Sequence, residues 1–294
     1  MASKSSIEKE FWTPGISPRL TEIFKRRYLL NLLVHKELRV RYRGSFLGML
    51  WSYAKPAVQF IVFYVALGVF LAQNRAIENY VVYLFSGVVV VNYFSEIFNN
   101  TTRSIVWNAP LVKKIYLPRQ LFPVSSLCVA VVHLIPQLVI LVLGALIYGW
   151  RPGFYELGLG ILGFMLVSIF ALGLGLFTSA INVMFRDAEN FVDLILMVVT
   201  WASPVLYKWQ DVHRILGGTI WWWIYMLNPI TPIVLIFHRV FWFPTAGVGG
   251  VSPVAQLPEN MYMWVGICAL ISFLMLLIGD WYFRHLDGRF AQEL

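Results

Sequence analysis

The side chains that could perform chemistry are few in this 294-residue sequence, and they form no recognised catalytic pattern. No Gly-Lys dipeptide occurs, which excludes the Gly-x4-Gly-Lys-Ser/Thr loop that binds ATP phosphates. The sequence also lacks His-Glu-x-x-His, Cys-x-x-Cys and Gly-x-Ser-x-Gly, and its five histidines show no ligand spacing. We therefore predict no catalytic residue, no metal site and no bound cofactor: the chain is not an enzyme.

Two carboxylates, Glu96 and Asp193, fall well inside apolar runs. An acidic residue inside a membrane span is by default a functional candidate, because a charge there is costly. A proton relay normally needs several such groups, and Asp187 has the position of a helix N-cap. We therefore predict structural roles for all three, with Asp193 pairing to a neighbouring helix.

Residues 107–123, WNAPLVKKIYLPRQLFP, place basic and apolar side chains between two long apolar runs. Pro110 suits the first turn of a helix, and Pro118 cannot continue one. Between them lies an apolar ridge beside a basic edge, formed by Leu111, Val112, Ile115, Tyr116, Lys113 and Lys114. This pattern predicts a short stiff element that moves its two flanking helices together, which suits force transfer from a soluble motor. An ordinary basic loop is the alternative.

The elements that must position these residues are membrane helices. Hydrophobic residues make up 59% of the chain and charged residues 13%, whereas soluble domains average about 25% charged. Continuous apolar runs of about 20 residues can each cross a bilayer. We expect one all-α integral membrane domain over 1–294, with six crossings at 56–72, 80–102, 120–149, 154–183, 189–208 and 261–283. Close helix packing is the expected role of the glycines in the fourth crossing, Gly158, Gly160, Gly163, Gly173 and Gly175.

The distribution of Lys and Arg predicts the orientation. With the N-terminus inside, most of the 23 Lys and Arg residues fall on the cytoplasmic side, as the positive-inside rule requires. We therefore expect a multi-pass membrane protein with both termini in the cytoplasm. The net charge of +8 then reflects this topology, and it gives no indication of nucleic-acid binding.

Within residues 209–243, the apolar stretch 221–243 is long enough to span, but Asn228-Pro229 and Thr231-Pro232 interrupt its centre. A single crossing would also move the C-terminus outside, against the charge distribution. A helix–break–helix hairpin that enters from the external face fits better. Irregular backbone at membrane depth is tolerated only beside protein or a water-filled cavity, so this segment indicates a pore.

Residues 22–43 have the pattern of an amphipathic helix lying in the cytoplasmic interface. Arg41 interrupts the apolar face, and Glu37 lies four residues before it, a favourable spacing for an ion pair on a helix. Attachment to anionic lipid explains most of the pattern. Docking to a cytosolic partner, or binding a phosphorylated lipid, stays open as a second role.

Four segments, in this order, carry a family resemblance: LRVRYRGSFLGMLWSYAKP (38–56), NAPLVKKIYLPRQLFPV (108–124), MFRDAENFVDLILMVVTWASPVLY (184–207) and LNPITPIVLIFHRVF (227–241). They resemble the permease subunit of ABC-2 type polysaccharide exporters, the O-antigen and teichoic-acid group. The resemblance covers nearly the whole chain. Its details are similar to the actinobacterial branch that exports lipid-linked galactan for the mycobacterial cell wall.

This resemblance implies a permease homodimer with two copies of a separate ATPase, which would bind ATP and Mg²⁺, and a lipid-linked polysaccharide as substrate. Residues 108–118 resemble the coupling helix that docks on the ATPase, so the coupling residues would be Asn108, Pro110, Leu111, Val112, Lys113, Lys114, Ile115 and Tyr116. Residues 22–43 resemble the interface helix. Residues 209–243 resemble the re-entrant gate helices, with the external gate at Trp221, Trp222, Trp223, Asn228 and Pro229.

Two further sets of candidates follow from this substrate. Aromatic rings offer flat platforms for the C–H faces of sugars, and aromatic residues make up 16% of the chain. The channel candidates are Phe60, Phe63, Tyr64, Tyr83, Phe85, Tyr93 and Phe94, with lipid contact or helix packing as the alternative for each. The candidates for the lipid pyrophosphate are Arg41, Arg43 and Lys55, since Arg can hold phosphate with two donors. Generic headgroup anchoring is the alternative for these three.

Two other function classes stay open. The chain could be a small-molecule or lipid permease with the same architecture. A membrane-embedded transferase would need an acid–base constellation at one interface, and the sequence offers none.

Overall fold

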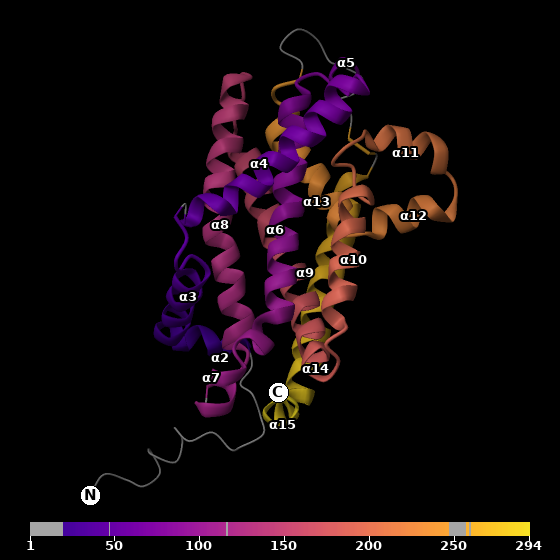
Figure 1. Cartoon of the computed structure of the whole chain (residues 1–294). Coiled ribbons are helices and arrows are strands. Elements are labelled where there is room, and N and C mark those ends of the chain that lie inside the picture. The colour runs from indigo at the N-terminus through magenta and orange to yellow at the C-terminus, as the bar shows by residue number, and fades with distance from the viewer. Residues whose placement is uncertain (1–19, 47, 116, 247–256, 259) are drawn as a thin grey trace, which may run out of the picture.

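The computed structural model describes residues 20–46, 48–115, 117–246, 257–258 and 260–294. Within these ranges every regular element is helical, as predicted (Figure 1). In chain order the α-helices are α2 (Leu20–Ile23), α3 (Arg27–Arg41), α4 (Trp51–Phe63), α5 (Gln73–Ala76), α6 (Tyr80–Trp107), α7 (Ala109–Lys114), α8 (Leu121–Ile147), α9 (Phe154–Met184), α10 (Ala188–Trp201), α11 (Trp209–Leu216), α12 (Ile220–Leu227), α13 (Ile230–Phe237), α14 (Met261–Leu286) and α15 (Phe290–Glu293).

Four of these helices, α6, α8, α9 and α14, are long and apolar enough to cross a membrane. They coincide with the crossings predicted at 80–102, 120–149, 154–183 and 261–283. Among the four, α6 is the most deeply buried, and it stands between α8 and α9 in Figure 1. It is therefore the central helix of the bundle.

The first and fifth predicted crossings form shorter helices. The first consists of α4 continued by a π-helical segment, Tyr64–Phe70, and the fifth, α10, ends at Trp201. By length and composition, the described residues hold four candidate spans, or five if the bent α12–α13 segment counts as one. The six-crossing topology therefore stays a prediction.

Helices α9 and α14 approach each other at two glycines. A Cβ atom built on Gly279 would lie 2.1 Å from the carbonyl oxygen of Gly173, and one on Gly173 would lie 2.6 Å from the amide nitrogen of Leu276. Small residues permit this backbone approach. The packing role predicted for glycines of the fourth crossing holds at Gly173, but a Cβ on Gly158 would meet no atom within 4 Å.

The predicted interface helix at 22–43 is not one continuous helix. A 3₁₀ turn, Phe24–Arg26, separates α2 from α3. The interruption lets Ile23 enter the protein core, where it is fully buried. Helix α3 then packs along α8 through Leu33, while Leu32 on its other side is 56% exposed.

The hairpin predicted at 209–243 has the expected break. Helix α12 and the segment Ile230–Trp242 are bent by 69° around Asn228-Pro229. Every side chain of α13 is buried, whereas Met226 is the one buried residue of α12. The helix–break–helix geometry is present, and its re-entrant placement in a membrane stays a prediction.

A second apolar core lies at the end of the molecule that carries α7, which we call the α7 end. It gathers side chains of α2, α7, α8, α14 and α15, each at most 7% exposed: Ile23, Val112, Phe122, Phe283 and Phe290. Figure 1 shows α2, α7 and α15 together at this end, opposite α5 and α11. The residues predicted to receive force therefore belong to a packed unit that includes the C-terminal helix.

Candidate functional site

Helix α7 is six residues long and joins the ends of α6 and α8 (Figure 1). Pro110 lies in its first turn, as predicted. Leu111 and Val112 face the second core, with Val112 buried. Four predicted coupling residues are exposed, namely Pro110, Lys113, Lys114 and Ile115. Tyr116 lies outside the described residues. Two residues of the predicted apolar ridge, Leu111 and Val112, therefore anchor α7 to the protein, whereas Ile115 faces outward.

Asn108 connects α7 to the interface helix. Its side chain amide donates a hydrogen bond to the carbonyl oxygen of Ser104 at 2.8 Å. Its amide oxygen accepts a hydrogen bond from the ammonium group of Lys36 on α3. The side chain is 5% exposed, so both bonds are shielded from water. The contact ties the movement of α7 to that of α3.

We expect Asn108→Ala to lower the free energy of unfolding by about 1–3 kcal/mol, because it leaves buried polar partners unpaired. Thermal unfolding of the detergent-solubilised protein measures this. Asn74→Ala, at an exposed position of α5, is the control and should change stability by less than about 0.5 kcal/mol. Equal melting temperatures for the two variants would contradict the bridging role.

Glu37 also faces the bundle, where it accepts a hydrogen bond from the Ser125 hydroxyl of α8 at 2.8 Å. Burial raises the pKa of Glu37 above its ordinary value, and the Ser125 hydrogen bond and the charges of Lys36 and Arg41 oppose that rise. The structure pairs Arg41 with a different carboxylate, Glu96, so the predicted Glu37–Arg41 ion pair gives way to contacts between helices.

Arg41, Glu96 and His133 form a charged cluster that joins α3, α6 and α8. The guanidinium of Arg41 donates to the Glu96 carboxylate at 2.9 Å. The same carboxylate contacts Nδ1 of His133, whose Nε2 lies 2.7 Å from the hydroxyl of Tyr42. Nδ1–H donating to Glu96, with Nε2 accepting from the Tyr42 hydroxyl, is the tautomer that pairs both ring nitrogens. Arg41 thus interrupts the apolar face of its helix because it reaches into the bundle.

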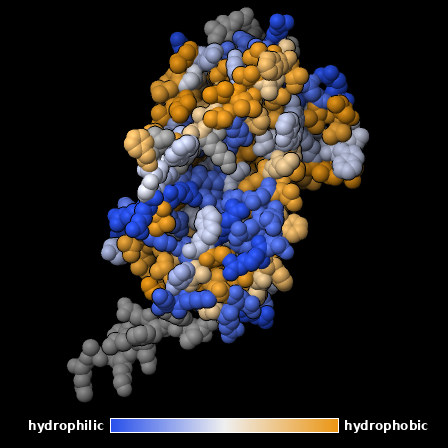
Figure 2. Space-filling model, viewed as in Figure 1, coloured by the Kyte–Doolittle hydropathy of each residue, from blue (hydrophilic) through white to orange (hydrophobic). Residues whose placement is uncertain are grey.

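A polar cavity of about 860 Å³ opens beside this cluster, between α3, α4, α6, α8 and α10. Figure 2 shows hydrophilic residues gathered around a hollow in the middle of the viewed face. One wall is a polar stripe along α6, made by Asn92, Ser95, Glu96, Asn99, Asn100 and Arg103. These positions recur at three- and four-residue intervals, so they share one side of the helix.

Arg103 organises the far side of the cavity. Its guanidinium donates to Glu189 at 3.0 Å and to Asp193 at 2.9 Å, both on α10. The amide of Asn99 donates to Asp193 at 3.0 Å. The prediction that Asp193 pairs with a neighbouring helix is confirmed, and the pairing fixes α10 against α6. Asp187 is the residue before α10, and its side chain makes no capping hydrogen bond.

The segment of sequence that forms this cavity matches a known protein family. The model of the family described as ABC-2 type transporter matches residues 28–242, which run from the second residue of α3 through α13 and include both walls of the polar cavity. The chain belongs to the ABC-2 type transporter family. With its long apolar helices, it is accordingly a multi-pass membrane protein.

Proteins similar to this chain include three whose names describe export or transport. The O-antigen export system permease protein RfbA of Klebsiella pneumoniae is 29% identical over 271 residues, 91% of this chain and 96% of that protein. RfbA of Myxococcus xanthus is 28% identical over 221 residues, 75% and 83% of the two chains. The polysialic acid transport protein KpsM of Escherichia coli is 22% identical over 217 residues, 71% and 79%.

The three candidates for binding the lipid pyrophosphate differ in their position relative to the polar cavity. Arg41 lines the polar cavity, with its guanidinium already paired to Glu96. Arg43 is exposed beyond the end of α3 and is not among the residues that line this cavity. Lys55 lies on α4, and its side chain is outside the described part of the structure. Of the three, Arg41 alone is shown facing the cavity.

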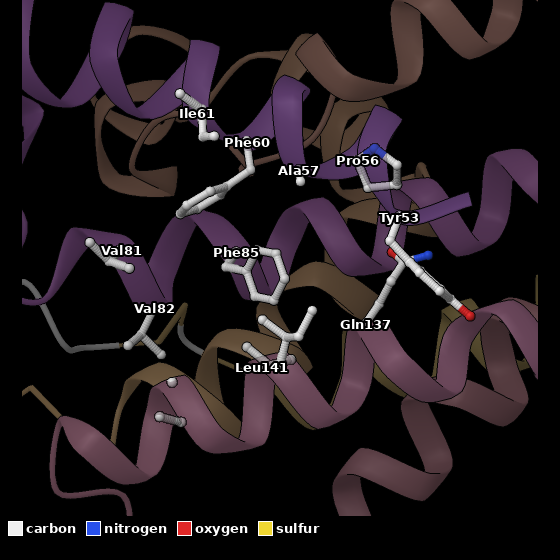
Figure 3. A pocket seen from close by; sticks show the side chains of 13 residues that line it. Tyr53, Pro56, Ala57, Phe60, Ile61, Val81, Val82, Phe85, Gln137 and Leu141 are labelled. Carbon is white, nitrogen blue, oxygen red and sulfur yellow. The ribbon is translucent and has the colours of Figure 1, made fainter. Parts of the chain in front are cut away.

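The channel candidates separate into two groups. Phe60, Phe63, Tyr64 and Phe85 lie between α4 and its neighbours, with the Phe60 and Phe85 rings 5.0 Å apart (Figure 3). The other three, Tyr83, Tyr93 and Phe94, are at most 4% exposed. They pack against rings of other helices in the same chain, so they offer no surface to a sugar here. None of the seven lines the polar cavity, where Trp51 is the aromatic residue.

The predicted external gate residues point in different directions. Trp221 and Trp223 are 61% and 52% exposed, and Trp223 lies 5.3 Å from the ring of Trp264. Trp222 packs on His213 of α11. Asn228 donates to the carbonyl oxygen of Ala202 at 3.2 Å, which ties the hairpin to the turn after α10. The carbonyl oxygen of Pro229 accepts a contact from the Cys268 thiol at 3.3 Å.

The polar stripe of α6 is the feature that sequence reasoning missed. Only Glu96 among its six residues was singled out. The signal that could have revealed it is the spacing of its residues. Polar residues at 92, 95, 96, 99, 100 and 103 recur every three or four positions, so they form one face of a helix within an apolar span. A buried stripe of that kind predicts either a polar neighbour or a water-filled cavity.

Proposed function

We propose that this chain is the transmembrane permease subunit of an ATP-driven exporter, which moves a lipid-linked cell-envelope polysaccharide out of the cytoplasm. The main support for this proposal is the family match together with relatives named for O-antigen export and polysialic acid transport. The polar cavity supports it, because a sugar chain needs hydrogen-bonding walls inside an otherwise apolar bundle. The resemblance to galactan exporters makes galactan the first substrate to test.

The motor in this proposal is a separate ATPase that binds at the α7 end. The sequence contains no phosphate-binding loop of its own. Helix α7 offers a suitable contact, with Lys113, Lys114 and Ile115 exposed and Val112 anchored in the second core. The distribution of basic residues supports a cytoplasmic location for this end and for both termini. The resemblance to bacterial polysaccharide exporters supports the bacterial plasma membrane as the location of the protein. ATP and Mg²⁺ would bind only to the partner.

The proposal includes a homodimer with two ATPase copies. Helix α10, which borders the polar cavity, exposes an apolar row beside it: Phe191, Leu194, Ile195, Val198 and Trp201. A second copy meeting this row would complete the wall of the cavity and enclose a path between the chains. The six crossings and the re-entrant external gate belong to the same proposal.

Depletion of the protein in its native cells tests the proposed function. We expect lipid-linked polysaccharide to accumulate on the cytoplasmic side, and complementation to reverse this. A diffusible small molecule accumulating instead would favour a small-molecule permease of the same architecture. Unchanged levels of every lipid-linked glycan would contradict the proposal.

A further inference from the structure

A second cavity lies beside the polar one and has the opposite character. It has a volume of about 230 Å³ and lies between α4, α6 and α8 (Figure 3). Its lining side chains are apolar except for the hydroxyl of Tyr53 and the amide of Gln137. Apolar cavities of about 150 Å³ already bind benzene, so this one can hold several carbons of a hydrocarbon chain.

The apolar cavity has a buried floor and an open rim. Val82, Leu141 and Ala145 on the floor are at most 2% exposed. Ile61 of α4 and Ile140 of α8 on the rim are 57% and 53% exposed. An opening between two exposed aliphatic side chains on a membrane protein faces the hydrocarbon of the bilayer. A lipid chain could therefore enter sideways.

The two cavities adjoin each other. Pro56 of α4 and Gln137 of α8 line both. Tyr53 lines the apolar cavity and Asn92 lines the polar one. The hydroxyl of Tyr53 and the amide nitrogen of Asn92 are buried and have no hydrogen-bond partner in the described part of the chain. Unpaired buried donors of this kind are rare, and both would be satisfied by the acceptor oxygens of a ligand.

We propose that the apolar cavity holds the hydrocarbon chain of the lipid-linked substrate while its diphosphate lies across the Pro56–Gln137 junction. The diphosphate oxygens then accept hydrogen bonds from Tyr53 and Asn92, and Arg41 lines the adjoining polar cavity. This inference rests on the proposed function, because it names where the lipid part of that substrate binds. It assigns Phe60 and Phe85 to the lipid chain and removes them from the sugar path.

Gly144 offers a way to fill the cavity without displacing protein. It lines the cavity, and a Cβ built on it would meet no atom within 4 Å. Gly144→Leu should therefore fold and occupy the space meant for the lipid. Gly266 of α14 likewise has no atom within 4 Å of a built Cβ and lines neither cavity, so Gly266→Leu is the matched control.

The experiment uses purified full-length protein in phosphatidylethanolamine vesicles with a polyprenyl diphosphate that carries a diazirine near its head. We expect photolabel on the peptides that contain Phe60 and Phe85. Gly144→Leu should reduce labelling about tenfold, the loss expected when two methylene groups can no longer be buried, and Gly266→Leu should not. Excess unlabelled polyprenyl diphosphate should compete, and excess phosphatidylglycerol should not.

Three outcomes would overturn the inference. Labelling that Gly144→Leu leaves unchanged would place the chain elsewhere. Equal competition by phosphatidylglycerol would make the cavity a site for bilayer lipid. A disulfide between two Ile140→Cys chains would mean that a second copy covers the opening. If depletion accumulates lipid-linked polysaccharide but the cavity is not labelled, the lipid site alone fails; if nothing accumulates, the proposed function fails as well.

Discussion

Gly279→Ala should destabilise the protein by roughly 3 kcal/mol or more, near the upper end of what a single added methyl group causes. The new Cβ would lie 2.1 Å from the Gly173 carbonyl oxygen, and that oxygen belongs to backbone, which cannot rotate away. Helices α9 and α14 must therefore separate, and their packing is the most extensive helix pair in the structure.

The control for this prediction lies on the same helix. Gly266→Ala introduces the same methyl group where nothing lies within 4 Å. It should be neutral or stabilising by up to about 1 kcal/mol, since alanine has the higher helix propensity. Thermal unfolding in detergent compares the two. A Gly279→Ala protein as stable as Gly266→Ala would mean that α9 and α14 do not meet at these glycines.

Arg103→Met should lower stability by about 2–3 kcal/mol, because it leaves two carboxylates of α10 without their shared cation. Arg103 is itself only 17% exposed, whereas Asp193 is 54% exposed toward the cavity, so the loss should fall below that of a fully buried pair. Export should fall too, since α10 forms one wall of the polar cavity.

Neutralising Glu189 and Asp193 shows whether Arg103 stabilises the protein through its charge or through the packing of its side chain. Adding Glu189→Gln and Asp193→Asn to Arg103→Met should recover most of the lost stability, because no unpaired charge remains. Arg214→Met removes the exposed Arg214–Asp211 pair and should cost less than about 1 kcal/mol. A triple variant as unstable as Arg103→Met would show that the size of the arginine side chain, not its charge, holds α10.

The long helices could be predicted from the sequence because their signal is local. Continuous apolar runs ended by turn residues predicted α6, α8, α9 and α14 to within a few residues, and Asn228-Pro229 predicted the bend before α13. The exposed side of α7 likewise follows from two lysines and two prolines in one short stretch.

The polar cavity could not be predicted in the same way, because its contacts join distant segments. In the sequence, Arg41 only interrupts the apolar face of an amphipathic helix. Its role is visible once the fold brings Glu96 and His133 beside it. The burial of Tyr83, Tyr93 and Phe94 depends on which helices surround α6, and apolar composition alone does not define that order. The close approach of Gly173 and Gly279 could not be predicted from the sequence either, since many glycines occur in the spans but few meet the backbone of another helix.

The most direct test of the central claim is substrate-dependent ATP hydrolysis and export in proteoliposomes that contain the permease and its ATPase. Lys113→Glu combined with Ile115→Asp changes exposed residues of the α7 end, and Arg75→Glu changes an exposed residue on α5 at the opposite end. We predict that the first variant loses ATPase binding and coupled export by about tenfold or more, and that the second keeps both. Export by the permease alone along an ion gradient, or full coupling in the α7 variant, would contradict the account.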